Sequence, residues 1–245
     1  MTTPDPIITL LLTQRLLGVG LLIQNAEIFR TRRIYAGGGA LAGNGIGSLL
    51  AVRSAILLWL IIAPIHCISL ATAAIHLALL GSSAWLVVRS RGPVCGGSDS
   101  MFFQVQLGLF VASLGFLNPL LVRIGLGWIA AQSVLSYFLA GLAKLKNTCW
   151  RNGTALQKLF SSDGPYVLWS GVRGLAESKS LCALLGWGVV AFELAFAALL
   201  VLPVEGKWIF LGLGLAFHLA NAVILGLNRF VWAWTATYPA LLYFS

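Results

Sequence analysis

The sequence predicts an all-α protein, a polytopic integral-membrane bundle of about eight transmembrane helices with a short interfacial helix. Hydrophobic residues make up 59% of the 245 residues and charged residues only 9%, against roughly 25% charged in an ordinary soluble domain. The mean hydropathy is +0.91. Apolar residues form long unbroken runs rather than the alternating segments of a transmembrane barrel. This composition excludes a disordered chain and a free-standing soluble enzyme.

The N-terminal part contains three predicted spans, because a helix needs about 20 apolar residues to cross a bilayer. The first is expected at 7–29, and the basic, glycine-rich stretch 30–44 after it is expected to be a loop. The apolar run 46–88 is too long for one helix. Pro64 lies near its middle, and proline ends or kinks a helix. We therefore predict two spans joined around 64–66.

A second group of spans follows a predicted loop at 90–100. Asn118-Pro119 separates two of these spans, and a tight turn at 203–206 separates two others. The most polar part of the chain, 146–179, lies between the two pairs, and we expect a short interfacial helix at 152–160 within it. The four spans are predicted at 101–116, 120–145, 180–202 and 208–227.

The last apolar run, 230–244, is short and aromatic. It is expected to be an eighth span, tilted or in a thinned bilayer, or else a re-entrant segment. The N-terminus lacks the positive region of a secretory signal, so we expect no cleavable signal peptide. Residues 1–245 are predicted to form a single transmembrane domain with no extramembrane domain.

Basic residues outnumber acidic ones, 16 to 7, for a net charge of +9. If the chain has eight spans, most of the basic residues fall on one side of the membrane, as expected for cytoplasmic loops. We therefore predict an integral protein of the bacterial inner membrane with both termini extracytoplasmic, in contact with lipid and without a nucleic-acid partner. The residues on that face are Arg30, Arg32, Arg33, Arg53, Arg89, Arg91, Lys144, Lys146, Arg151, Lys158, Arg173, Lys179 and Arg229.

Several ionisable side chains lie within apolar runs, where a charge costs several kcal/mol unless it is paired or hydrated. Each is either one partner of an interhelical ion pair or part of a site. His66 is expected to be interfacial, and His76 to be either a structural or a functional group. The ionisable residues within the runs are Arg15, Glu27, Arg123 and Glu193.

The four cysteines, Cys67, Cys95, Cys149 and Cys182, form no CxxC pair. A zinc knuckle or a thioredoxin-like redox pair would require one. We expect free thiols and no metal site.

Lys144 ends the fifth predicted span, and two interpretations of it stay open. A snorkelling lysine keeps its stem in lipid and its ammonium at the interface. A lysine withheld from water inside the bundle holds its proton less tightly and can act as a base. Asp99, at the start of the fourth span, is either an ordinary helix cap or a group that holds Lys144 or accepts a proton.

His218 and Asn221 are three positions apart in the seventh span, so they share one helix face. A polar face of this kind either clasps two helices together or orients a substrate. The residues alone leave both interpretations open.

Three motifs in order resemble the HTTM family, the "horizontally transferred transmembrane" domain shared with vitamin K-dependent γ-glutamyl carboxylase. They are the run from Tyr137 to Leu145 with Trp150-Arg-Asn-Gly153 after it, the Gly96-Gly-Ser-Asp99 stretch before it, and the closing Phe217-His218-Leu-Ala-Asn221 segment with its aromatic tail to Tyr238-Pro239. The resemblance covers about 95–245.

The resemblance implies a mechanism in which Lys144 acts as the base on a reduced, vitamin K-like quinone. Oxygenation of the quinol with O2 then provides a strong base, which removes a γ-proton from a peptide glutamate so that CO2 can add. Asp99 would orient Lys144 or shuttle protons, and His218 would share the catalytic pocket. Tyr137, Trp150 and Asn221 would contact the cofactor.

Other functions also fit the sequence. A maturation factor for a secreted peptide toxin, of the sporulation-delaying protein B type, would work with partners and without chemistry of its own. A DoxX-like quinone-binding subunit is a third possibility, although the missing CxxC argues against a thiol relay. A transporter is disfavoured because no paired broken helices occur in corresponding halves. The preferred interpretation is a carboxylase-like membrane enzyme that modifies a small peptide or another membrane-proximal substrate, with a separate soluble subunit as a possible partner.

Overall fold

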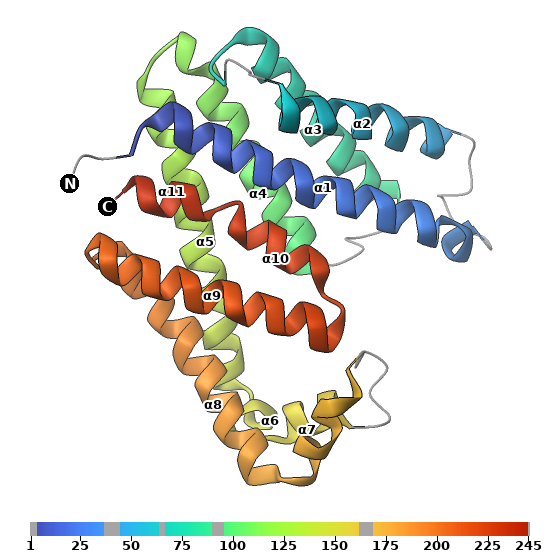
Figure 1. Cartoon of the computed structure of the whole chain (residues 1–245), viewed down its shortest axis with the longest axis vertical. Coiled ribbons are helices and arrows are strands. Elements are labelled where there is room, and N and C mark those ends of the chain that lie inside the picture. The colour runs from blue at the N-terminus through green and yellow to red at the C-terminus, as the bar shows by residue number, and fades with distance from the viewer. Residues whose placement is uncertain (1–3, 37–44, 64–66, 90–95, 162–168, 245) are drawn as a thin grey trace. The chain divides into compact units, whose positions relative to one another are not determined.

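The computed structural model describes residues 4–36, 45–63, 67–89, 96–161 and 169–244. All elements in these ranges are helical (Figure 1). Seven of the helices are long and apolar enough to cross a membrane. The prediction of an all-α, polytopic membrane protein is therefore confirmed. His66 and Cys95 lie outside the described residues, as do the predicted turn at 64–66 and the part 37–44 of the predicted loop at 30–44.

The chain divides into two compact units, 1–130 with 232–245 and 131–231. In the first unit, α1 (Pro6–Ala36) packs against α2 (Gly45–Ile62) and α4 (Gly96–Ser113), and α3 (Leu70–Arg89) packs against α4. The first part of α5 (Leu120–Lys146) and the short helix α11 (Tyr238–Tyr243) complete it. α11 packs against α1, and the N- and C-terminal ends lie at the same end of this unit (Figure 1).

In the second unit, the rest of α5 leads into two short helices, α6 (Thr148–Arg151) and α7 (Thr154–Phe160), which both pack against α8 (Lys179–Ala195). The 3-10 segments η2 (Ser170–Glu177) and η3 (Phe196–Leu200) flank α8. The unit continues with α9 (Val204–Leu225) and the start of α10 (Asn228–Thr235). The predicted interfacial helix at 152–160 is thus present as α7.

Polar side chains mark where several helices begin. Asp5 Oδ1 accepts from the Ile7 amide at 2.7 Å, Asn118 Oδ1 from the Leu120 amide at 2.9 Å, and the Ser178 hydroxyl from the Leu181 amide at 3.3 Å. Such bonds satisfy backbone N–H groups that have no partner within the first turn. Asn118 explains why α5 begins where Asn-Pro was expected to separate two spans.

Three predicted boundaries were wrong. α1 continues through the expected loop as far as Ala36, and α4 already begins at Gly96, so Asp99 lies in its first turn. α9 begins directly after Pro203 instead of after a turn. In each case small or charged residues near a helix end were mistaken for a loop, although the backbone hydrogen bonds of the helix continue through them.

The C-terminal run, expected to be a tilted or a re-entrant eighth span, forms two short helices, α10 and α11. Arg53 was assigned to a basic loop face, and this assignment was wrong. It lies inside α2 and is only 2% exposed. His76 is also buried and its Nε2 lies 3.2 Å from Gln14 Oε1, which makes it part of a structural contact between α1 and α3.

Candidate functional site

One face of α5 carries two polar residues of the site, Tyr137 and Lys144, with Gly141 between them. Tyr137, Gly141 and Lys144 follow one another at spacings of four and three positions, which places them on the same side of a helix. This side faces α8. A Cβ atom on Gly141 would lie 3.1 Å from the Glu193 Cβ and 3.0 Å from a Leu194 carbon. The missing side chain therefore lets α5 and α8 approach closely at the level of Lys144.

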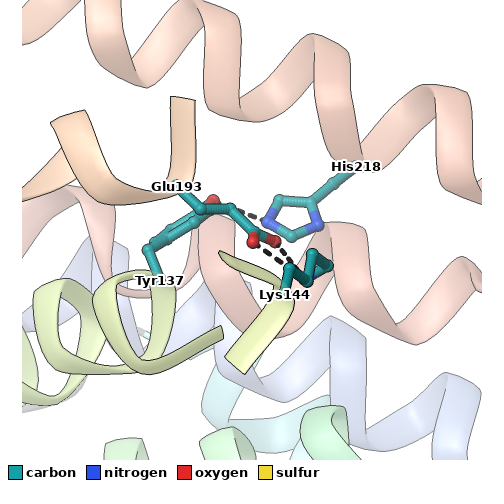
Figure 2. Close-up of polar contacts among 4 residues, drawn as sticks. All are labelled: Tyr137, Lys144, Glu193 and His218. Carbon is teal, nitrogen blue, oxygen red and sulfur yellow. Dashed lines mark hydrogen bonds and ion pairs between the residues drawn. The ribbon is translucent and has the colours of Figure 1, made fainter. Parts of the chain in front are cut away.

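Lys144 forms an ion pair with Glu193 across this contact (Figure 2). Its Nζ lies 2.7 Å from Oε1 and 2.8 Å from Oε2. The side chains are 20% and 5% exposed, respectively. The ammonium also lies 5.1 Å from the ring centroid of Trp150, within the range of a cation–π interaction. Lys144 is therefore held by an acid and an aromatic face, and it does not extend freely into the interface as a snorkelling lysine would.

A second polar pair lies beside it, between Tyr137 and His218 (Figure 2). The phenol oxygen is 2.6 Å from His218 Nε2, and both side chains are buried. Either atom is the donor, according to the tautomer of the imidazole. The Tyr137 ring stacks on Phe196 with centroids 3.7 Å apart and meets Phe192 edge to face at 5.8 Å. Aromatic rings thus surround the Tyr137–His218 pair, as the Trp150 ring lies against Lys144 of the first pair.

The loop after α5 is shaped by Gly153, which has a left-handed φ of 82°. A Cβ atom there would lie 2.6 Å from both the Ala183 nitrogen and the Lys179 oxygen of α8. Only glycine combines this φ with so close an approach. The Trp150-Arg-Asn-Gly153 sequence therefore brings the chain back onto α8, where Trp150 can cover Lys144.

A family model described as the HTTM domain matches residues 122–245. The match spans half of the chain and contains both polar pairs. The chain belongs to the HTTM domain family. No curated protein and no solved structure matches it.

Two other predicted site residues of this HTTM protein, Asn221 and Asp99, belong to neither polar pair. Asn221 lies on α9 with His218 but is only half-buried, and its side chain makes no hydrogen bond within the described residues. Asp99 belongs to the first unit, ahead of the family match. There its Oδ1 accepts a 2.8 Å hydrogen bond from Gln24 Nε2, and it interacts electrostatically with Arg53. The structure thus brings Lys144, Trp150, Tyr137 and His218 together within one unit.

Glu193 is the residue of the HTTM site that the motifs did not single out. It stood among the ionisable residues within apolar runs, for which an interhelical ion pair or a site was expected. The ion pair is confirmed, and its partner is Lys144. The signal that could have found it is charge balance, because a lone acid in a span needs a basic partner. Among the described residues, no group of three or more His, Cys, Asp and Glu side chains could hold a metal ion.

Proposed function

We propose that this HTTM protein is a carboxylase-like membrane enzyme that uses Lys144 as a base. One observation carries the proposal: the Lys144 ammonium donates to both carboxylate oxygens of Glu193 between the apolar helices α5 and α8, and it lies against the Trp150 ring. A largely buried ion pair, in which Lys144 is 20% and Glu193 5% exposed, is an expensive way to hold two helices together, since well-packed apolar residues often do so equally well. A pair between Lys144, which lies in the motif, and Glu193 of the facing helix is better explained by proton transfer.

Glu193 supplies the acceptor that such a base requires. A protonated Lys144 cannot remove a proton, and the Glu193 carboxylate is within hydrogen-bond distance to receive the proton from its ammonium. Transfer converts two charged groups into a neutral amine and a neutral acid. The amine of Lys144 is then free to deprotonate a bound substrate or cofactor.

The residues around the pair fit a reduced quinone. The Tyr137–His218 pair can donate and accept hydrogen bonds, and the rings of Phe192, Phe196 and Trp150 supply flat apolar surfaces. When bound, a quinol would supply, with O2, the strong base needed to remove a carbon-bound proton for reaction with CO2. Tyr137 and His218 would fix its hydroxyl groups, and the aromatic wall would exclude water.

We propose the bacterial inner membrane as the location, with the Lys144 end of α5 facing the cytoplasm. Arg151 and Lys158 lie in the short helices that connect α5 to α8, and Lys146 and Lys179 lie at the ends of α5 and α8 that these helices join. Cytoplasmic connections are rich in lysine and arginine. A small peptide is the proposed substrate, presented by a separate soluble subunit.

Mass spectrometry of small peptides and extracted quinones tests this function. Cells would express the wild type, Lys144→Ala, or the matched control Lys146→Ala, which changes an exposed lysine at the same helix end. We expect a peptide that gains the mass of CO2 in the wild type and in Lys146→Ala but not in Lys144→Ala. A different mass change that is present in the wild type but absent in Lys144→Ala would keep the enzyme assignment and indicate another reaction. Identical peptides and quinones in all three strains would contradict the enzyme and favour the accessory maturation factor.

A further inference from the structure

The first unit contains a pocket of about 410 Å³ between α1, α3 and α4. Its wall is mostly apolar, with Leu86, Phe102 and Phe103 among its members. Val88, at the α3 side, is 78% exposed. In helices that cross a bilayer, exposed apolar side chains face lipid. The pocket is therefore open to molecules dissolved in the membrane.

Polar side chains from three helices meet at this pocket. Gln24, Ser83, Asp99 and Gln106 all line it and are all buried. Behind them lies Arg53 of α2, whose Nη2 donates to Gln24 Oε1 at 3.1 Å and to Ser83 Oγ at 2.8 Å. A polar cluster of this size within four membrane helices is costly, and such groups commonly mark a ligand site.

Several N–H groups of the cluster have no hydrogen-bond partner in the described part of the chain. Ser83 Oγ donates to Gln106 Oε1 at 3.2 Å, so the oxygens of Gln24, Ser83 and Gln106 already accept hydrogen bonds. The Nε and Nη1 atoms of Arg53 are buried and have no hydrogen-bond partner in the described part of the chain. Each glutamine amide also has a second N–H group beyond the one bond that it donates. Besides the Asp99 carboxylate, which accepts from Gln24, the cluster therefore offers buried N–H groups that a ligand oxygen can bind.

The charge around the cluster favours an uncharged ligand. The Arg53 guanidinium interacts electrostatically with the Asp99 carboxylate, which lines the pocket. An anionic head group would add a second negative charge beside Asp99. A carbonyl oxygen accepts hydrogen bonds without a net charge.

We infer that this pocket binds the carbonyl head of an uncharged, membrane-soluble amphipath. The Gln24 and Gln106 amides supply the donors, with Arg53 holding Gln24 in place from behind, and Leu86, Phe102 and Phe103 contact the apolar body. The carbonyl of a fatty-acyl ester and that of a quinone share this chemistry. The inference concerns the first unit and does not depend on the proposed function of Lys144.

Photolabelling of the purified full chain in lipid nanodiscs tests the inference. The probe is the methyl ester of palmitic acid carrying a diazirine and a terminal alkyne. We expect label in peptides from 83–106, competed by methyl palmitate or by decylubiquinone, but not by hexadecane. Methyl palmitate as the better competitor would identify an acyl ligand, and decylubiquinone a quinone. Equal competition by hexadecane would overturn the inference, because it would show that the polar cluster contributes nothing.

Three variants complete the test. Val87→Trp places a large ring at the pocket wall without touching the polar cluster, and should abolish labelling. Val52→Trp adds the same ring to an exposed position of α2 outside the pocket, and should label like the wild type. Gln106→Leu removes an amide and should weaken competition by the carbonyl compounds about tenfold.

Labelling that persists in Val87→Trp at the wild-type level would overturn the site. Lys144→Ala should label normally, because labelling needs no turnover. Failure of the proposed enzyme and failure of this pocket are thus observed separately.

Discussion

Glu193 and Lys144 are bound to each other at both carboxylate oxygens, so neither can change without affecting the other. If Glu193 only anchored Lys144, any polar partner of the same shape would serve. If it accepts the lysine proton, the carboxylate itself is required. Glutamine has nearly the same shape and can still accept a hydrogen bond from Lys144, but it cannot take up a proton. The two roles therefore differ in what a single Glu193→Gln substitution does.

We expect Glu193→Gln to lower turnover about a hundredfold, the scale of a lost acid–base group. The remaining activity should rise with pH, because hydroxide or buffer must then remove the proton from Lys144. The measurement is turnover against pH, with Glu205→Gln as control, since Glu205 is an exposed acid in the first turn of α9. Glu193→Asp should restore part of the activity. Wild-type turnover in Glu193→Gln would show that Glu193 acts only as an anchor.

At the scale of elements, the connection from α5 to α8 positions the site. Two short helices and Gly153 fold this polar stretch onto α8, and a core of Leu156, Phe160, Val172 and Cys182 holds it there. Trp150 packs against the same core. The position of its ring over Lys144 therefore depends on the turn at Gly153.

Gly153→Ala should destabilise the second unit by more than about 2 kcal/mol. Alanine is strained at a φ of 82°, and its Cβ would overlap α8 backbone that cannot move away independently. Thermal unfolding in detergent, followed by the fluorescence of tryptophan, measures the loss. Gly174→Ala is the matched control, because a Cβ on Gly174 meets no atom within 4 Å. Equal stability of the two variants would contradict the structural role of Gly153.

The helices were predictable and the pairings between them were not. Apolar runs and Asn118-Pro119 predicted the spans, since a bilayer fixes their length and polarity. The boundaries at Ala36 and Gly96 were missed, because arginine and glycine are tolerated at helix ends. Lys144 was identified from its motif. Its partner Glu193 is 49 positions away, and its proximity depends on Gly141, whose importance appears only when α5 and α8 are packed together. For Arg53, the charge pattern predicted a place on the basic face of the membrane, whereas its side chain is buried among the helices.

At the scale of the whole molecule, the proposed membrane orientation rests on the basic residues near the connections between helices. The exposed Cys149 lies directly after α5, among these connections, whereas Cys67 and Cys182 are buried. In a Cys95→Ser background, a membrane-impermeant maleimide should leave Cys149 unlabelled in intact spheroplasts and label it in inverted vesicles. The opposite pattern would place the Lys144 end of α5 outside the cytoplasm and reverse the proposed topology.

The chain's two units also differ in how they are built. The first is assembled from both ends of the sequence, because α11 packs against α1, while the second is a continuous segment, 131–231. Thr237, Ala240 and Leu241 of the C-terminal segment are buried. Removing this segment takes buried contacts from the first unit and leaves every residue of the second unit in place.

A chain truncated after Val231 should therefore lose the structure of its first unit and keep that of its second. Cys67 and Cys182 report on the two units separately, since each is a buried thiol in one of them. Burial raises the pKa of the Cys67 thiol, which leaves less of the reactive thiolate. In the full chain, both thiols should resist a small maleimide. In the truncated chain, Cys67 should react rapidly and Cys182 should stay protected. Protection of both thiols would mean that α11 is dispensable, and exposure of both would mean that the two units fold as one.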